Sequence, residues 1–137
     1  MNPPIISNFL PSFVQEPKEF KRQYLNVLQN QKYISKVQEA TKHEILSDME
    51  GRLEKIKHNA QMCKDKIAEL EKDTSYQARQ SRKTEEEILK NWQMKEKQQT
   101  DEIEGVDGNG GVKGTINQLQ ENQLDLDIFM RKAEEIK

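Results

Sequence analysis

Apolar residues recur along the middle of the chain at alternating steps of four and three residues. The residues between them are almost all polar, so the apolar positions form one narrow stripe rather than the wide face of a globular helix. This is the heptad pattern of a coiled coil, whose stripe is buried by a partner helix. We therefore expect the stripe to bind a partner helix. Its members are Met49, Leu53, Ile56, Ala60, Cys63, Ile67 and Leu70, and Thr74 follows at the next step.

The segment 17–104 has the composition of a long helix, because it is rich in Lys, Glu and Gln and contains a single glycine, Gly51. Pro17 suits the first helical position, and Glu19 lies in the first turn, where the helix dipole favours an anion. Upstream of the heptad stripe the apolar pattern is broader. It comprises Phe20, Tyr24, Val27 or Leu28, Ile34, Val37 and Thr41.

Two steps of four follow each other between Ile45 and Leu53. Such a stutter locally unwinds a supercoil. Gly51 lies beside it and costs the helix about 1 kcal/mol relative to alanine. The pattern predicts a bend or a change of helix partner near 45–53.

Between Glu71 and Glu87 the heptad positions that would continue the stripe are occupied by polar residues. Here the helix either continues without a tight partner or breaks near 73–84. Thr84 and Glu87 match the Ser/Thr-x-x-Glu capping box, which would mark a new helix start at that point.

The C-terminal part of the chain predicts a helical hairpin. Residues 105–114 contain five of the six glycines, and Thr115 with Gln118 forms a capping box directly after them. Reflection of the sequence about this loop places apolar residues opposite apolar ones, which favours antiparallel packing of 115–137 against the preceding helix. The expected hairpin core comprises Ile88, Leu89, Trp92, Ile103, Ile116, Leu119, Leu126, Phe129, Met130 and Ala133.

Residues 1–16 differ from the rest of the chain, because they carry one charge and are rich in proline and large apolar residues. Prolines at positions 3, 4, 11 and 17 prevent one continuous helix. We expect this segment to dock into a groove on another protein. Folding back on the first helix and contact with a membrane surface are the alternatives. The docking residues would be Ile5, Ile6, Phe9, Leu10, Phe13 and Val14.

Composition excludes several classes of protein. Of the 137 residues, 33% are hydrophobic and 34% are charged, and the net charge is only −2. Low hydrophobicity with balanced charge suits a solvated helix and leaves little core for a catalytic pocket. No apolar stretch is long enough to span a bilayer, and no secretory signal is evident. A single cysteine, Cys63, favours a reducing compartment.

The candidate ligand-binding motifs fail on spacing. The glycine-rich loop lacks the Gly-Lys-Ser/Thr order of a phosphate loop, because Lys113 precedes Gly114. As a calcium loop it would place Gly105 and Ile116 where oxygen ligands are required. We therefore expect no cofactor in this loop.

The remaining chemical candidates favour a structural interpretation. Glu39 with His43, and Glu54 with His58, are spaced for two metal ligands each, which is too few for a site. Cys63 lies inside the apolar stripe, where a buried apolar role is expected rather than a nucleophilic one. The short basic cluster at 79–83 is followed at once by three glutamates, so we expect a solvated face rather than a nucleic-acid site.

Together these patterns predict an all-α, elongated coiled-coil protein with one long helix and a C-terminal antiparallel helical hairpin. The expected function is a non-catalytic scaffolding subunit that staples protein partners within a multiprotein assembly, for example a cytoskeletal one. The alternative is an adaptor or chaperone-like protein in trafficking or secretion that binds a partner transiently. We expect a cytoplasmic or cytoskeletal location and coiled-coil partners that are copies of this chain or other proteins. We expect no catalytic residue, metal site, nucleic acid, membrane insertion or small-molecule substrate.

Overall fold

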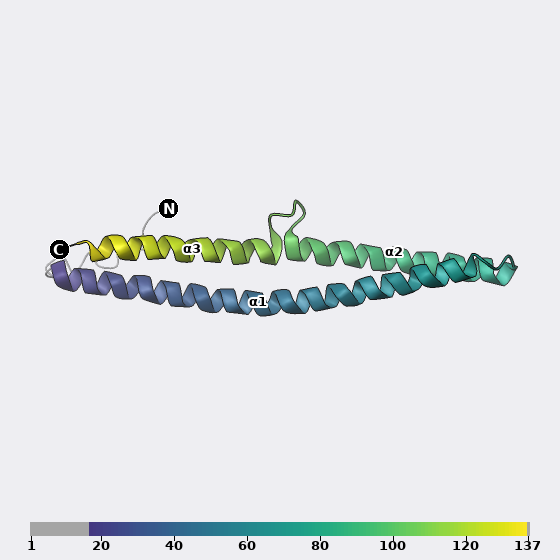
Figure 1. Cartoon of the computed structure of the whole chain (residues 1–137), viewed down its shortest axis with the longest axis horizontal. Helices are drawn as coiled ribbons and strands as arrows, with labels where there is room; N and C mark the ends of the chain where they lie inside the picture. The colour runs from purple at the N-terminus through teal and green to yellow at the C-terminus, as the bar shows by residue number, and fades with distance from the viewer. Residues whose placement is uncertain (1–16, 137) are drawn as a thin grey trace. The chain divides into compact units, whose positions relative to one another are not determined.

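The computed structural model describes residues 17–136 (Figure 1). These residues form three helices and no strand: α1 (Pro17–Leu70), α2 (Tyr76–Glu104) and α3 (Gly111–Glu134). The expected all-α fold, with a long first helix followed by helices toward the C-terminus, is confirmed. The described chain divides into two compact units. The first contains 17–43 and 115–136, and the second contains 44–114.

The segment 17–104 is two helices rather than one continuous helix, because α1 ends at Leu70 and α2 begins at Tyr76. Ser75 is the N-cap of α2, and its hydroxyl accepts a hydrogen bond from the backbone N–H of Ala78 at 3.1 Å. Of the two alternatives for this part of the chain, the structure shows the break, and it lies at 71–75. The capping box at Thr84 does not start a helix, because the Thr84 hydroxyl donates to the Gln80 carbonyl within α2.

The loop after α2 is shorter than the glycine-rich segment, because α3 already begins at Gly111, four residues before the capping box at Thr115. Gly105 ends α2 with φ +80°, a conformation that side chains rarely adopt. A Cβ atom there would lie 2.7 Å from the backbone of Gly110, so the two ends of the loop meet at a point where only glycine fits. The Gly110 N–H donates to the Glu104 carbonyl at 2.9 Å and closes the loop.

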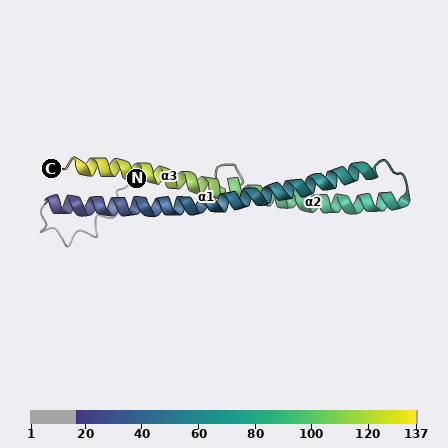
Figure 2. The same ribbon diagram turned by 60° about the horizontal axis from the view of Figure 1, so that its bottom comes forward.

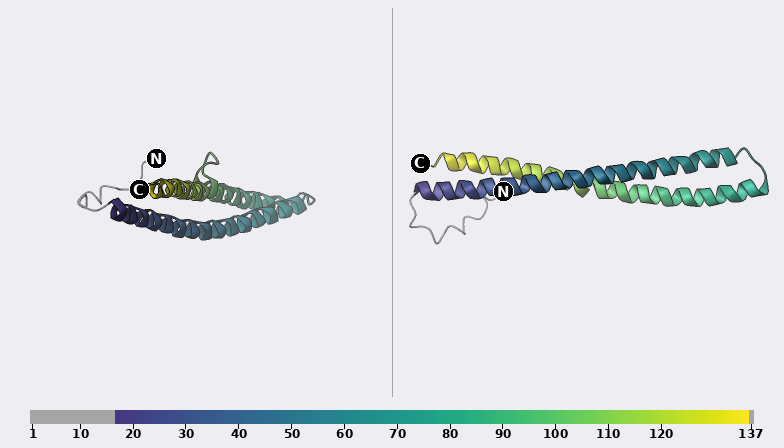
Figure 3. Two further views of the ribbon diagram at one scale, coloured as in Figure 1. Left: turned by 60° about the vertical axis from the view of Figure 1, so that its left-hand side comes forward. Right: turned by 90° about the horizontal axis from the view of Figure 1, so that it is seen from below.

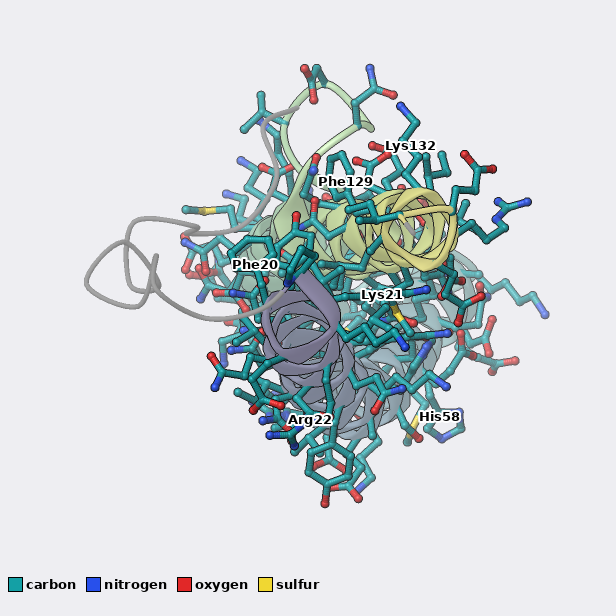
Figure 4. The ribbon with its side chains drawn as sticks, turned by 90° about the vertical axis from the view of Figure 1, so that its left-hand side faces the viewer. Phe20, Lys21, Arg22, His58, Phe129 and Lys132 are labelled. Carbon is teal, nitrogen blue, oxygen red and sulfur yellow. The ribbon has the colours of Figure 1, made fainter. Side chains whose placement is uncertain are left out.

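In the first unit α1 and α3 pack antiparallel (Figures 1 and 2). Lys21 donates to the Glu134 carbonyl at one end, and Ser35 donates to the Leu119 carbonyl toward the other. Figure 4 shows Lys21 on the side of α1 that faces α3. The core is formed by Tyr24, Leu28, Leu126 and Ala133, with Phe20, Leu25, Phe129 and Met130 packed against it.

In the second unit α2 packs antiparallel against the C-terminal part of α1 (Figure 3). The buried apolar residues are Met49, Ala60 and Cys63 from α1, and Ala78 and Ile103 from α2. Three of these five side chains are small. Small side chains at a helix contact allow the helix axes to approach closely.

The helix partner of α1 changes along its length. Its residues up to His43 pack with α3, and its residues from Glu44 onward belong with α2. This change lies immediately before the range 45–53 in which the stutter predicts a bend or a change of partner. The heptad break therefore coincides with a boundary between two helix pairs.

The buried leucine of the first unit gives a direct test of its core. Leu28 is fully buried, whereas Leu124 on α3 is 64% exposed. We expect Leu28→Ala to lower the free energy of unfolding by about 2–5 kcal/mol, because it removes apolar contacts and leaves a cavity. Leu124→Ala, the same change at an exposed site, should cost about 0.5 kcal/mol or less. Urea unfolding followed by circular dichroism measures both, and equal effects would contradict the packing of α1 against α3.

Candidate protein-interaction surfaces

The stripe that predicts a partner helix is covered by α2 of the same chain. Met49, Ala60 and Cys63 are buried, and the other members of the stripe, Leu53, Ile56, Ile67 and Leu70, are half-buried. Lys66 forms an ion pair with Glu85 of α2 across the same helix pair, with Nζ and Oε1 2.9 Å apart. The apolar stripe thus obtains a partner within the chain. Whether it also binds another protein stays a prediction.

A shallow groove between α1 and α2 contains the only cysteine of the chain. Its lining comprises Asn59, Met62, Cys63 and Lys66 from α1, and Glu85 and Trp92 from α2. Burial raises the pKa of the Cys63 thiol, and the negative charge of Glu85 raises it further. The thiol is therefore protonated at neutral pH, and a protonated thiol is a poor nucleophile.

Trp92 lies in this groove with one face occupied by a cation. The ammonium of Lys95 is 4.6 Å from the centre of a Trp92 ring, a distance typical of a cation–π contact. The indole is half-buried. Lys95 and the groove between α1 and α2 therefore each cover part of the indole, and the rest of it is open to solvent.

The reflection about the glycine-rich loop predicted that 115–137 packs on the preceding helix, whereas α3 packs on α1, and the expected hairpin-core residues therefore lie in both units. In the first unit Leu126, Phe129, Met130 and Ala133 join the core built on Tyr24 and Leu28 of α1, Ile116 is buried and Leu119 is half-buried. Figure 4 labels Phe129 together with Phe20, which packs against the same core. In the second unit Ile103 is buried, Leu89 and Trp92 are half-buried and Ile88 is 37% exposed.

A layer of polar side chains joins α1 to α3 beyond the apolar core of the first unit. The Gln123 amide donates to Glu39 Oε1 at 2.9 Å and to the Ser35 hydroxyl at 3.3 Å. The Gln120 amide donates to Glu39 Oε2 at 3.2 Å, and His43 Nε2 lies 3.0 Å from the same oxygen. We call these five residues the polar layer.

Glu39 is the charged centre of the polar layer. Its side chain is 20% exposed, so its carboxylate receives more of its hydrogen bonds from neighbouring side chains, and fewer from water, than a free surface carboxylate does. The hydrogen bonds from Gln123, Gln120 and His43 lower the pKa of Glu39, in that order of size. The i, i+4 spacing pairs Glu39 with His43 but does not reveal their partners on α3. The signal for them was the polar Gln123 at a core position of the C-terminal heptads.

Two residues of the broad upstream stripe are exposed, so this stripe and the core of the first unit do not coincide. Ile34 is 54% exposed and Val37 is 49% exposed, whereas Ser35 between them is buried. Along α1 the buried side chains are Tyr24, Leu28 and then Ser35. Ser35 can be buried because its hydroxyl forms hydrogen bonds with polar groups of α3. Ile34 and Val37 are consequently left on the surface of α1.

Exposed apolar side chains occur on every helix. On α1 they include Tyr33, Ile34 and Val37, on α2 they include Tyr76 and Met94, and on α3 they include Leu124 and Ile128. The pair Leu124 and Ile128 is spaced by one helical turn and lies on a face of α3 away from the buried Leu126 and Ala133. The docking residues expected at 1–16 lie outside the described residues.

Within residues 17–136, no three His, Cys, Asp or Glu side chains gather where they could hold a metal ion. None of the three helices has an apolar stretch of the length needed to cross a bilayer. The chain matches no family model, no curated protein sequence and no solved structure. The candidate surfaces therefore rest on the exposure and contacts of this chain's own residues.

The lowered pKa of Glu39 predicts a pH-dependent contribution to stability. A carboxyl whose pKa is lower in the folded than in the unfolded chain stabilises the fold above the unfolded value, about 4.3 for Glu, and loses this effect as the pH falls through the folded value. The stability difference between the wild type and Glu39→Gln should therefore shrink as the pH falls from about 6 to about 3. Urea unfolding at each pH measures this difference.

The exposed Glu121 provides the control for this measurement. Glu121→Gln removes a carboxylate from the same helix pair without touching the polar layer, so its stability difference from the wild type should vary less with pH. If both variants gave the same pH dependence, the polar layer would make no special contribution.

Proposed function

We propose that this protein is a non-catalytic scaffolding subunit that binds other proteins through helix–helix contacts within a multiprotein assembly, such as a cytoskeletal one. The observation that carries the proposal is the exposure of large apolar side chains on helix faces that point away from the chain's own cores. Leu124 and Ile128 of α3 are 64% and 41% exposed, while Leu126 between them is buried. A helix with apolar residues on both sides can bind a second helix without releasing its first partner.

The exposed apolar residues are notable because of the composition around them. With 34% charged residues, the chain has ample polar side chains to cover its surface. Apolar side chains that stay exposed and recur at helical spacing are typical of interaction surfaces. Burial of such surface contributes about 25 cal/mol per Å², so a few large side chains suffice to support a helix contact.

A second candidate function is an adaptor or chaperone-like role in trafficking or secretion, with transient binding. The polar layer favours this alternative. Beyond Leu28 the contact between α1 and α3 includes hydrogen bonds made by Ser35, Glu39, Gln120 and Gln123. A polar contact of this kind stabilises a helix pair less than apolar packing does, so α3 could separate from α1 more readily.

The proposed location is cytoplasmic or cytoskeletal. Cys63 is buried and its thiol has a raised pKa. A protonated, buried thiol persists as a free thiol in a reducing compartment. The lone cysteine therefore suits such a compartment.

The outer face of α3 provides the test of the proposed function. The variant Leu124→Lys/Ile128→Lys places two charges on this face and keeps good helix formers. Proteins that bind this face should then be captured at least about tenfold less by the tagged full chain, because each buried unpaired charge costs several kcal/mol. Quantitative mass spectrometry of crosslinked complexes from cells that express the protein measures the loss.

Gln93→Lys/Gln98→Lys is the matched control, since it adds the same two charges to exposed polar positions of α2, away from the outer face of α3. It should capture the same proteins as the wild type. Partners that remain bound in stoichiometric amounts after dilution support the scaffolding function, whereas partners that exchange support the adaptor function. Equal capture by all three forms would contradict both.

A further inference from the structure

The two sides of the α1–α3 pair differ in charge. On one side charged groups join the helices, because Lys21 donates to the Glu134 carbonyl at 2.8 Å and Lys32 Nζ lies 2.6 Å from Asp127 Oδ1. The other side holds a groove between the helices, and none of its lining residues is charged. We call it the uncharged groove. It is lined by Gln31, Ile34, Ser35 and Gln38 of α1 and by Leu119, Asn122 and Leu126 of α3.

Toward Pro17 the same side of the pair becomes apolar. Val27 and Phe20 precede Ile34 by seven and fourteen residues, so they lie on the same face of α1. Phe129 follows Asn122 by seven residues on α3, and both phenylalanines pack against the core of the first unit. Figure 4 shows Phe20 and Phe129 on one side of the helix pair and Lys21 on the other. The uncharged groove thus continues as an apolar strip to the start of α1.

The lining of the uncharged groove suits an apolar peptide in an extended conformation. Ile34 is 54% exposed and offers apolar surface to an occupant. The amides of Gln31, Gln38 and Asn122 can donate to and accept from the unpaired N–H and C=O groups of an extended backbone. The nearest charges, Asp125 and Lys132, follow Asn122 and Phe129 by three residues and border the groove only at its outer rim on α3.

The chain itself carries a peptide of this chemistry directly beside the groove. Residues 1–16 hold six large apolar residues and one charge, Glu16, and they join α1 at Pro17. Sixteen residues reach at most about 55 Å, whereas Pro17 and Ile34 are about 26 Å apart along the helix. The range 5–14, which holds all six apolar residues, spans about 30 Å when extended, so its length matches that of the groove and its apolar strip.

We propose that residues 1–16 fold back at Pro17 into the uncharged groove of their own chain and run antiparallel to α1 toward Ile34. Attachment at Pro17 gives the segment an effective concentration of about millimolar, far above that of a second copy in a micromolar solution. The charged side of the pair does not compete, because an apolar segment there would remove Lys21 and Lys32 from water. Docking of the segment on another protein, the sequence-based expectation, then requires its release from the groove.

This inference is independent of the proposed function. It concerns the side of the first unit that carries Phe20 and Phe129, whereas the proposed function depends on Leu124 and Ile128 on the outer face of α3. Either can therefore fail while the other stands.

Photocrosslinking locates the segment in the purified full chain. With p-benzoylphenylalanine in place of Phe9, irradiation of a dilute solution should link residue 9 to the uncharged groove or to its apolar strip. The product should keep the mass of one chain, 16.1 kDa, and peptide mass spectrometry identifies the linked residue. A product of twice this mass would show that a second copy is the occupant. That result would overturn the proposal, as would links confined to the side of Lys21 and Lys32 or the absence of any link within the purified chain.

A charge in the groove tests the contact, with a matched control one residue away. Ile34→Glu in the chain that carries the crosslinker should lower the yield of the link at least about tenfold, because the segment would have to cover a charge. Tyr33→Glu places the same charge at the neighbouring residue, which is 70% exposed and does not line the groove, and should leave the yield unchanged. Circular dichroism should show the same helicity in both variants. Equal yields from the two would overturn the proposal.

Urea unfolding of the full chain gives a readout that needs no crosslinker. Phe9→Ser/Phe13→Ser should lower the unfolding midpoint of the wild type, because the groove loses apolar surface that the folded chain covers. In an Ile34→Glu background the same two changes should have little effect, since the segment is already displaced. An unchanged midpoint in the wild type, or an equal loss in both backgrounds, would contradict the fold-back.

Discussion

The structure depends on one constraint: a helix with a narrow apolar stripe is unstable in water unless another helix covers the stripe. At 54 residues, α1 is longer than either helix that follows it. Its stripe is covered in two parts, by α3 up to His43 and by α2 from Glu44 onward. The turn at 71–75 and the glycine-rich loop at 105–110 serve this requirement, because each allows the chain to supply α1 with a partner. Both loops are short, and both are closed by specific local hydrogen bonds.

The two helix pairs meet the constraint with different chemistry. The pair of α1 and α2 is built on small buried residues such as Ala60, Cys63 and Ala78, with the Lys66–Glu85 ion pair at its edge. The pair of α1 and α3 has a compact apolar core around Leu28 and then the polar layer. Buried polar residues at core positions commonly fix the register of paired helices while adding little stability. The first unit is therefore expected to be well defined in register.

The heptad pattern was sufficient to predict the all-α fold, the long first helix and the burial of Met49, Ala60 and Cys63. It could not predict the partner of that stripe, because a stripe that pairs within the chain has the same spacing as one that pairs between chains. It grouped Ile34 and Val37 with the apolar stripe of α1 although both are exposed, since a count of apolar residues cannot show that Ser35 finds partners in Gln123 and the Leu119 carbonyl. The helix start at Ser75 was missed for a related reason: its cap involves Ala78 rather than the glutamate that marks a capping box.

Circular dichroism of the full chain on progressive dilution tests most directly whether α1 is stabilised within its own chain. Because α2 and α3 are part of that chain, the helical signal per residue should stay constant at concentrations where light scattering shows only monomer. A helical signal that falls on dilution in step with the loss of a dimer would contradict this account, since it would show that a second chain is needed to cover the stripe of α1.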